Sequence, residues 1–209
     1  EEALRMESAY CYFEDTSKVI DKALRSISVV QIENLISDCE KTIRSGHKVI
    51  ASGLGKNVPI CEKFEGTMLS LGLAAQFLHT NSAVHGDMGM VKPGDLVIIL
   101  TKSGSTSESV YLAELLKKRR DVKLWLLSFK KKSALADTMQ NKLIVTMEHE
   151  GDLWNIVPNN STTLNLIILQ TVAMQLAKRM GLELERDFKP NHPGGAIGEK
   201  LRYESSHKI

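Results

Sequence analysis

Five short apolar runs, separated by helical segments, constrain the fold of this chain more than any other feature. The segments between them repeat apolar residues every three or four positions, as helices do. Strands that alternate with helices form a parallel sheet covered by helices on both faces. We therefore predict an α/β fold: a three-layer α/β/α sandwich around a five-stranded parallel sheet. Its strands are expected at Val49–Ser52, Ala75–Leu78, Leu96–Leu100, Lys123–Ser128 and Leu143–Thr146.

Helices are expected before and after this core. Helical periodicity runs from Val19 to Ile43, so residues 1–45 are predicted to pack as N-terminal helices on a core formed by residues 46–209. The segment Thr162–Arg179 is apolar nearly all round, which predicts a helix buried between layers or subunits. The tail from Phe188 has no clear periodicity before Glu199. Since no linker or repeat is present, we expect one structural domain.

Composition excludes several classes of function. The chain has 27 lysines and arginines against 25 acidic residues, a net charge of +2, which gives no footprint for nucleic acid. The one basic cluster, Lys130–Lys132, is interpreted as a solvated loop. No apolar run approaches the roughly 18 residues of a membrane span. The three cysteines, at 11, 39 and 61, are odd in number and lack CxxC spacing, so a reducing cytoplasm is expected.

The polar residues that follow the strands point to a ligand site. Ligands of open α/β sheets bind outside the carboxyl ends of the strands. Gly53-Leu54-Gly55-Lys56 follows the first predicted strand, and Thr101–Glu108 follows the third. His79 and His85 follow the second, and His149–Asp152 follows the fifth. Convergence on one rim favours a small polar ligand over a protein-binding face.

The hydroxyl-rich loop Thr101–Thr106 is the sharpest local signal. Several hydroxyls and a helix N-terminus offer donors and partial positive charge to one oxyanion, which suits a phosphate monoester. The alternative is a helix N-cap at Ser105 or Thr106, with Glu108 completing a capping box. The glycine turn at Gly53–Lys56 is not a P-loop, because Ile50 and Asn57 stand where that motif needs glycine and a hydroxyl residue.

Two histidines lie in predicted loops where no apolar pattern indicates a packing role. His85 is close to Asp87, and His192 precedes a Pro-Gly-Gly turn. The alternatives are a loop histidine satisfied by Asp87 and an incidental residue at a chain reversal. His47 is expected to be structural or exposed. No His-x-His or His-Glu-x-x-His spacing is present, so neither a metal nor another cofactor is expected.

Together these segments resemble the sugar isomerase (SIS) domain, and within it the D-arabinose-5-phosphate isomerase family of the Kdo pathway. The resemblance covers roughly residues 15–203. It rests on Gly53-Leu54-Gly55-Lys56, His85-Gly86-Asp87-Met88-Gly89-Met90, Thr101-Lys102-Ser103-Gly104-Ser105-Thr106-Ser107-Glu108, Ser161-Thr162-Thr163 and His192-Pro193-Gly194-Gly195-Ala196-Ile197-Gly198.

The resemblance implies interconversion of D-ribulose 5-phosphate and D-arabinose 5-phosphate through an enediol. It places the catalytic side chains at Lys56, His85, Glu108 and His192. We expect Glu108 to be the base at C1 and C2, Lys56 to stabilise the enediolate, and a histidine to serve ring opening. The expected substrate-binding residues are Ser52, Gly53, Gly55, Thr101, Lys102, Ser103, Ser105, Thr106, Ser161, Thr162 and Thr163.

The chain also departs from the family pattern. Asn57-Val58 follows Lys56 where the family usually has Ser-Gly, and Ser105 stands where a glutamate is usual. Many members continue into paired CBS domains, so this chain looks like the form without them. That leaves a nucleotide-activated Kdo as a candidate regulator acting on the catalytic domain.

The resemblance further implies a homo-oligomer, a dimer of dimers, in which one or both of His85 and His192 cross to a neighbour's site. The product would supply Kdo for lipopolysaccharide or capsule. Two alternatives stay open: a non-catalytic module that senses a sugar phosphate or nucleotide sugar, and an isomerase for another phosphosugar.

Overall fold

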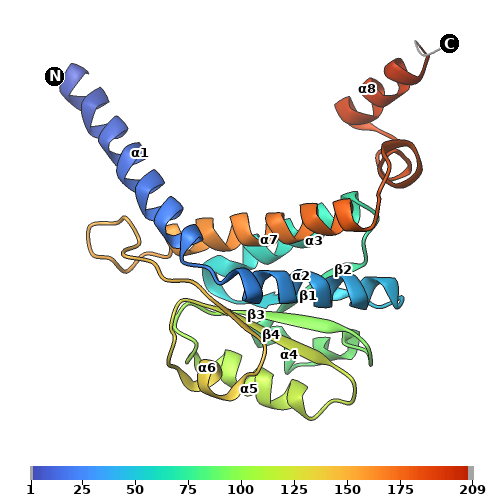
Figure 1. The fold of residues 1–209 in the computed structure, drawn as a ribbon, viewed down its shortest axis with the longest axis horizontal. Coiled ribbons are helices and arrows are strands. Elements are labelled where there is room, and N and C mark those ends of the chain that lie inside the picture. Colours follow the sequence, from blue (N-terminus) through green and yellow to red (C-terminus); the bar gives the residue numbers. More distant parts are fainter. Residues whose placement is uncertain (1, 207–209) are drawn as a thin grey trace.

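The computed structural model describes the backbone of residues 2–206 and the side chains of residues 8–202. Five parallel strands form one sheet in the order β2-β1-β3-β4-β5 (Figure 1). This confirms the predicted three-layer α/β fold. The strands are β1 (Val49–Gly53), β2 (Ala75–His79), β3 (Leu96–Leu100), β4 (Lys123–Ser128) and β5 (Lys142–Ile144).

Helices precede, connect and follow the strands. Those of four or more residues are α1 (Glu2–Arg25), α2 (Val29–Arg44), α3 (Val58–Ser70), α4 (Thr80–Ala83), α5 (Ser107–Lys117), α6 (Ala134–Thr138), α7 (Asn160–Arg179) and α8 (Gly195–Ser206), with a 3₁₀ turn η2 (Asp87–Met90) and a π-helical turn η3 (Leu184–Phe188). Two three-residue 3₁₀ turns are η1 (Gly55–Asn57) and η4 (Lys189–Asn191).

The sheet is buried on both faces because its central strands are apolar at nearly every position. In β3, Leu96, Ile98 and Leu100 pack with α2, α3 and α7, whereas Val97 and Ile99 pack with α5 and α6 on the other face. Figure 1 shows these helices as two layers on either side of the strands. Because successive side chains of a strand point to opposite faces of the sheet, one apolar run contributes to two cores.

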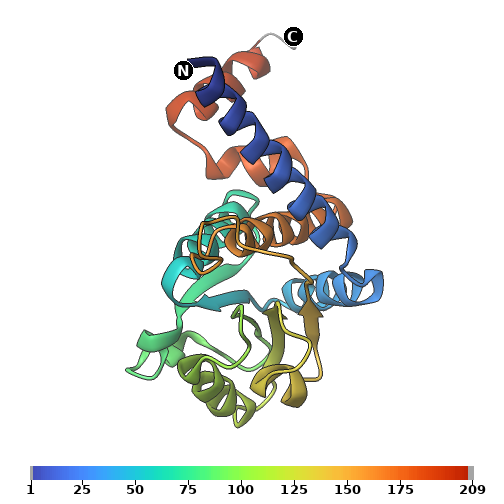
Figure 2. The ribbon, with the colours of Figure 1, turned by 90° about the vertical axis from the view of Figure 1, so that its left-hand side faces the viewer.

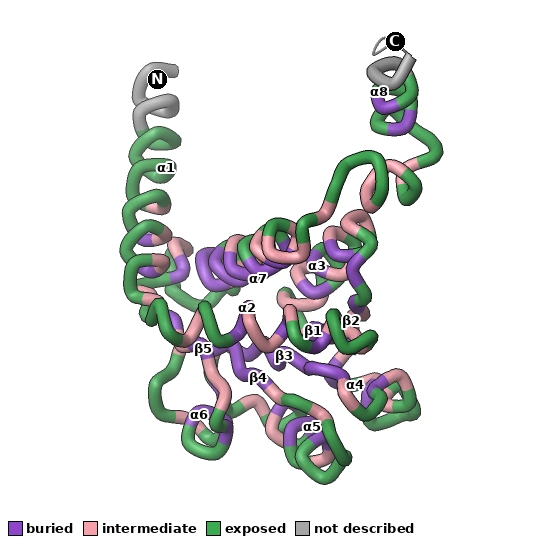
Figure 3. The backbone as a smooth tube through the Cα atoms, turned by 45° about the vertical axis from the view of Figure 1, so that its right-hand side comes forward, coloured by how far each residue is buried: buried purple, intermediate pink, exposed green. Residues whose placement is uncertain are grey.

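Two segments project from this body, α1 from one end of α7 and the C-terminal tail from the other (Figures 1 and 2). The last turns of α1 are held by Ala23 in the core and by an ion pair between Lys22 and Glu148. Further out, Tyr10, Cys11 and Phe13 are exposed, on the part of α1 that is green in Figure 3. The division expected between residues 45 and 46 stays a prediction. Helix α2, which precedes that boundary, buries Leu35, Ile36 and Cys39 in the same core as the sheet.

Three segments differ from the sequence expectation. The segment from Thr80 to Lys92, expected as a loop, contains α4 and η2, and the tail forms α8. Helix α7 is buried along one side only, with Thr171 and Met174 exposed, because α2 and α3 cover it from the sheet side. Lys130–Lys132 is an exposed loop as predicted. Within the described residues, no helix is long and apolar enough to span a membrane.

Close packing below the first glycine turn fixes the path from β1 into α3. A Cβ added at Gly53 would lie 2.9 Å from Asn57 Cβ and 3.2 Å from Cys61 Sγ. Asn57 is the N-cap residue of α3 and Cys61 lies in its first turn, so the strand end and the helix approach each other too closely for a side chain. Gly55 follows with a φ of +59°, which favours glycine.

We predict that Gly53→Ala lowers the free energy of unfolding by about 1–3 kcal/mol, because the added methyl group overpacks this contact. Urea unfolding followed by circular dichroism measures the change. Gly66→Ala is the matched control: Gly66 lies inside α3 with no heavy atom within 4 Å of an added Cβ. Helix propensity there favours alanine, so this variant should gain stability. Equal losses in both variants would contradict the packing argument.

Candidate functional site

The strand order places a switch point at β1. The connection that follows β1 runs to β2 on one side, and the connection that follows β3 runs to β4 on the other, so the two diverge between β1 and β3. In open parallel sheets such a crevice at the carboxyl ends is where ligands bind. Lys56 follows β1 at this edge, and the loop Thr101–Thr106 follows β3. The structure thus brings the two strongest sequence signals to adjacent strand ends.

The loop after β3 is held by its own hydroxyl groups. Thr101 Oγ1 lies 3.2 Å from Thr106 Oγ1, and Ser103 Oγ lies 3.3 Å from the same atom. The backbone N–H of Gly104 donates to Thr101 Oγ1, and that of Ser105 donates to Ser103 Oγ. Gly104 has a φ of +65°, and a Cβ there would lie 2.2 Å from Ser133 Oγ, so the loop needs glycine at this point.

Helix α5 begins at this loop without a side-chain cap. Thr106 is its N-cap residue, yet the Thr106 side chain makes no capping hydrogen bond. Ser105 Oγ instead accepts from the backbone N–H of Ala134. A capping box therefore does not explain the hydroxyls. Clustered hydroxyls beside the N–H groups at the start of a helix are the donors that an oxyanion requires.

Glu108 and His85 line the same pocket. This pocket of about 310 Å³ lies between α4 and α5 and is lined by Thr80, Asn81, Val84, His85, Glu108 and Tyr111. Both titratable side chains are exposed. The Glu108 carboxylate accepts from its own backbone N–H and from the Ser107 hydroxyl, which lowers its pKa. It is therefore held as an anion, and it shares the lining of this pocket with His85.

Two further predicted site residues differ in their exposure. Lys56 lies in the turn η1 and is exposed, and among the described residues its ammonium has no ion-pair partner. Ser52 is fully buried, and its hydroxyl lies 3.2 Å from that of Thr80. Ser52 thus joins the ends of β1 and β2 below the rim, while Lys56 remains available to a ligand. His79, at the same edge, caps α4 through Nδ1 and is structural.

Glu150 is a buried carboxylate that was not among the predicted site residues. It is 0% exposed and accepts four hydrogen bonds. Lys102 Nζ lies 2.6 Å and Ser161 Oγ 2.7 Å from Oε1, and the backbone N–H groups of Asn159 and Ser161 each lie 2.9 Å from Oε2. Burial alone would raise the pKa of this carboxyl, but the four donors outweigh it and lower the pKa. His149–Asp152 followed the fifth predicted strand, but no pattern singled out its glutamate.

The Ser161-Thr162-Thr163 segment lies in the first turn of α7. Ser161 is buried against Glu150, whereas the hydroxyls of Thr162 and Thr163 both donate to the carbonyl of Asn159. Glu150 acts as the cap of α7, since the side chain of the N-cap residue Asn159 makes no capping bond. The segment is therefore linked to the hydroxyl loop through Glu150 and Lys102.

His192 is not brought to this rim within one chain. Its ring stacks on Phe188 at a centroid distance of 4.0 Å, and its Nδ1 lies 2.9 Å from the Phe188 carbonyl oxygen. The neighbouring Asn191 donates to the carbonyl of Ser70, at the far end of α3. Lys56 precedes the start of α3, a helix of 13 residues and therefore about 20 Å long. His192 lies near the amino ends of the strands, opposite the other predicted residues.

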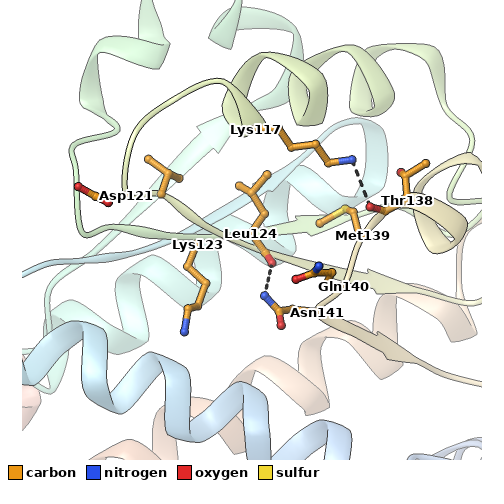
Figure 4. Close-up of a pocket in the computed structure, with 9 residues that line it drawn as sticks. Lys117, Asp121, Lys123, Leu124, Thr138, Met139, Gln140 and Asn141 are labelled. Carbon is orange, nitrogen blue, oxygen red and sulfur yellow. Dashed lines mark hydrogen bonds between the residues drawn. The ribbon is translucent and has the colours of Figure 1, made fainter.

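A second hollow lies away from this rim, at the amino ends of β4 and β5 (Figure 4). It measures about 530 Å³ and includes Lys117, Lys123, Gln140 and Asn141 in its lining. Its polar atoms are largely used within the protein. The Lys117 ammonium donates to the Thr138 carbonyl, and the Asn141 amide donates to the Leu124 carbonyl. Nowhere in the described part of the chain are three His, Cys, Asp or Glu side chains grouped as metal ligands.

Comparison with known proteins places this geometry in a family. The sequence profile of the SIS domain matches residues 42–175. The chain belongs to the SIS domain family. It is 37% identical over 163 residues to arabinose 5-phosphate isomerase KdsD of Salmonella typhi, over 78% of this chain and 49% of that protein. KdsD of Escherichia coli K12 is also 37% identical, over 81% of this chain and 51% of that protein. The matched part of this chain spans about half the length of these curated relatives.

Solved structures agree with the fold. The protein c3406 of E. coli CFT073, solved in complex with arabinose 5-phosphate, superposes with a TM-score of 0.80 at 24% identity, over 97% of this chain and 99% of that one. A protein of Bacteroides fragilis NCTC 9343 superposes with a TM-score of 0.81 at 26% identity, over 91% of this chain and 98% of that one. The α/β fold described above is therefore shared with these solved structures.

We predict that Glu150→Gln lowers the free energy of unfolding at pH 7 by about 1–3 kcal/mol, because Lys102 and the N-terminus of α7 lose a charged acceptor. The wild-type carboxylate has a lowered pKa in the folded state. Its stabilisation is therefore complete above the pKa of the unfolded chain, about 4.3, and is lost as pH falls through the folded value. Urea unfolding of both proteins between pH 7 and pH 3 measures this, and the difference should shrink toward pH 3. A constant difference would show that the charge does not contribute.

Proposed function

We propose that this chain is an aldose–ketose isomerase that interconverts D-ribulose 5-phosphate and D-arabinose 5-phosphate. The observation that carries the proposal is that His85 and Glu108 line one pocket. Glu108 lies in the first turn of α5, directly after the hydroxyl loop. The similarity to arabinose 5-phosphate isomerase KdsD supports the substrate. The likeness to a candidate phosphosugar isomerase of B. fragilis involved in capsule formation supports the substrate class.

The reaction needs a proton transfer and no outside oxidant or reductant. A base takes a proton from C1 of the ketose, the electron pair forms a double bond between C1 and C2, and the carbonyl oxygen at C2 takes up a proton. Return of a proton to C2 and loss of one from O1 gives the aldose. A positioned acid or base contributes roughly 10²–10⁴ in rate to each such transfer. The site therefore needs acid–base groups at C1 and C2 and a separate set of donors for the phosphate.

The residues at the rim match these two needs. Thr101, Ser103, Ser105 and Thr106, with the N–H groups of α5, would hold the phosphate. Glu108 would transfer the proton between C1 and C2, and Lys56 would stabilise the negative oxygen of the enediolate. His85 would serve the oxygen protons or ring opening. Lys102 would contact the substrate from the same loop, Thr162 and Thr163 would border the sugar, and Ser52, Gly53, Gly55 and Ser161 would shape the rim.

His192 would enter this site from another copy of the chain, in a homo-oligomer that we propose to be a dimer of dimers. Within one chain it lies on the opposite edge of the sheet, so only a neighbour could supply it. Large apolar side chains are exposed on the parts that project. Tyr10 and Phe13 on α1, Leu153 and Trp154 in the loop before α7, and Ile197 on α8 are each at least half exposed. Contact between copies would cover them.

We predict that incubation with D-ribulose 5-phosphate in deuterated water yields arabinose 5-phosphate with deuterium at C2, observed by NMR. Glu108→Gln should remove most turnover, because an amide cannot accept the proton. Lys118→Met, an exposed change at the far end of α5, is the control and should retain activity. Near-full turnover in Glu108→Gln would contradict its role as base.

The same experiment separates the other functions. Binding of the sugar phosphate without exchange would indicate a sensing module, and a different aldose would revise the substrate. A role in Kdo synthesis for lipopolysaccharide or capsule, and regulation by a nucleotide-activated Kdo, are proposed with the substrate. Inhibition of exchange when CMP-Kdo is added at millimolar concentration would support that regulator, and an unchanged rate would exclude it.

Complementation tests the transfer of His192 between copies. We predict that His192→Ala and Lys56→Ala are each inactive alone, and that unfolding and refolding them together restores turnover. Mixed oligomers then contain sites with an intact Lys56 from one copy and an intact His192 from the other. Refolding Lys56→Ala with Glu108→Gln is the control, because both residues lie on the same chain's rim. Recovery in that control, or none in the test mixture, would overturn the shared site.

A further inference from the structure

Lys102 connects the hydroxyl loop to the buried carboxylate. It directly follows Thr101, and its own carbonyl accepts from the Phe129 N–H and the Ser128 hydroxyl, so its backbone is fixed to β4. Its side chain extends to Glu150, with Nζ 2.6 Å from Oε1. The side chain is 39% exposed, whereas that of Glu150 has no exposed surface. The ion pair thus lies at the rim, with one partner open to solvent and the other enclosed.

The four donors around Glu150 differ in how easily each can break its hydrogen bond to the carboxylate. Asn159 and Ser161 donate from the backbone at the start of α7, a helix of 20 residues, and the Ser161 hydroxyl is itself buried. The two backbone donors cannot withdraw without opening the start of the helix, and the Ser161 hydroxyl has no solvent to bond to instead. Lys102 is held only by its flexible stem and is partly in solvent. It is therefore the one donor that can be exchanged.

A phosphate in the hydroxyl loop would compete for this ammonium. Thr101 and Ser103 flank Lys102 in sequence, and their hydroxyls belong to the cluster proposed to hold the phosphate. A phosphate dianion carries more charge than a carboxylate and makes strong charge-assisted hydrogen bonds with lysine. We infer that Lys102 is a positioning residue shared by two anions, Glu150 in the empty protein and the substrate phosphate in the loaded one. This inference rests on the phosphate loop of the proposed function.

Transfer of Lys102 would change what Glu150 can do. With three neutral donors and no cation beside it, the carboxylate binds a proton more readily, since burial favours the neutral form. The titratable groups on the segments around it are Lys102 on the hydroxyl loop, His149 and Asp152 on its own loop, and Tyr12 on α1, whose hydroxyl accepts from the Asn159 amide. Of the described side chains, Lys102 supplies the ion pair. Binding of phosphate would thereby prepare a second proton-accepting group.

The test follows the Glu150 carboxyl carbon by NMR in the full chain labelled with ¹³C-glutamate, with Glu150→Gln identifying the resonance. Inorganic phosphate is the probe, and its binding is followed by ³¹P NMR. In the wild type, saturation with phosphate should shift this resonance and raise the pKa of Glu150. In Lys102→Met the pKa should already be raised, and phosphate should leave the resonance unmoved. Lys118→Met should respond as the wild type does.

Two results would overturn the inference. One is phosphate binding to the wild type without a change at Glu150, and the other is the same phosphate response in Lys102→Met, which would mean a direct effect of the anion. Failure of phosphate to bind at all would overturn it together with the phosphate loop. The isomerase proposal is judged separately. Turnover with an unresponsive Glu150 defeats only the role of Lys102, and a responsive Glu150 without turnover defeats only the isomerase.

Discussion

The site depends on one enclosed negative charge. Glu150 ties together parts of the chain that are remote in sequence: the loop after β3 through Lys102, the start of α7 through Asn159 and Ser161, and its own loop after β5. An unpaired carboxylate in this position would be costly, because a buried ion without partners loses several kcal/mol of solvation. The arrangement is therefore cooperative. Each of these segments is held to the others through its ion pair or hydrogen bonds with this carboxylate.

Around that charge, sheet topology decides which residues can meet. Because all five strands are parallel, every connection that follows a strand begins at the same edge. The order β2-β1-β3 then opens the crevice beside β1, where the turn at Gly53 lets α3 start against the strand end. The hydroxyl loop lies next to it at the end of β3. The chain places Lys56, Lys102 and the N-terminus of α5 here, although its net charge is only +2.

Much of this could be predicted from the sequence because the responsible signals are periodic or local. The strand runs identify the sheet, and a parallel sheet gathers Lys56, Thr101 and Glu108 at one edge without knowledge of any side-chain geometry. Glu150 could not be found in this way, since its burial depends on the fold of the irregular loop between β5 and α7. His192 could not be placed either, because contacts such as that of Asn191 with Ser70 position the tail. The turns α4 and η2 are too short to show a period.

The thiol packed beneath Gly53 has a consequence for experiments on this protein. Burial raises the pKa of Cys61 far above its usual range, and the same holds for Cys39. Thiolates are the form that reacts with alkylating reagents, so both groups are inert in the folded chain. Cys11, the third cysteine, is exposed on α1. A fluorescent or spin label added to the wild-type protein would therefore attach at a single place, on the arm that projects from the body, and would report directly on its surroundings.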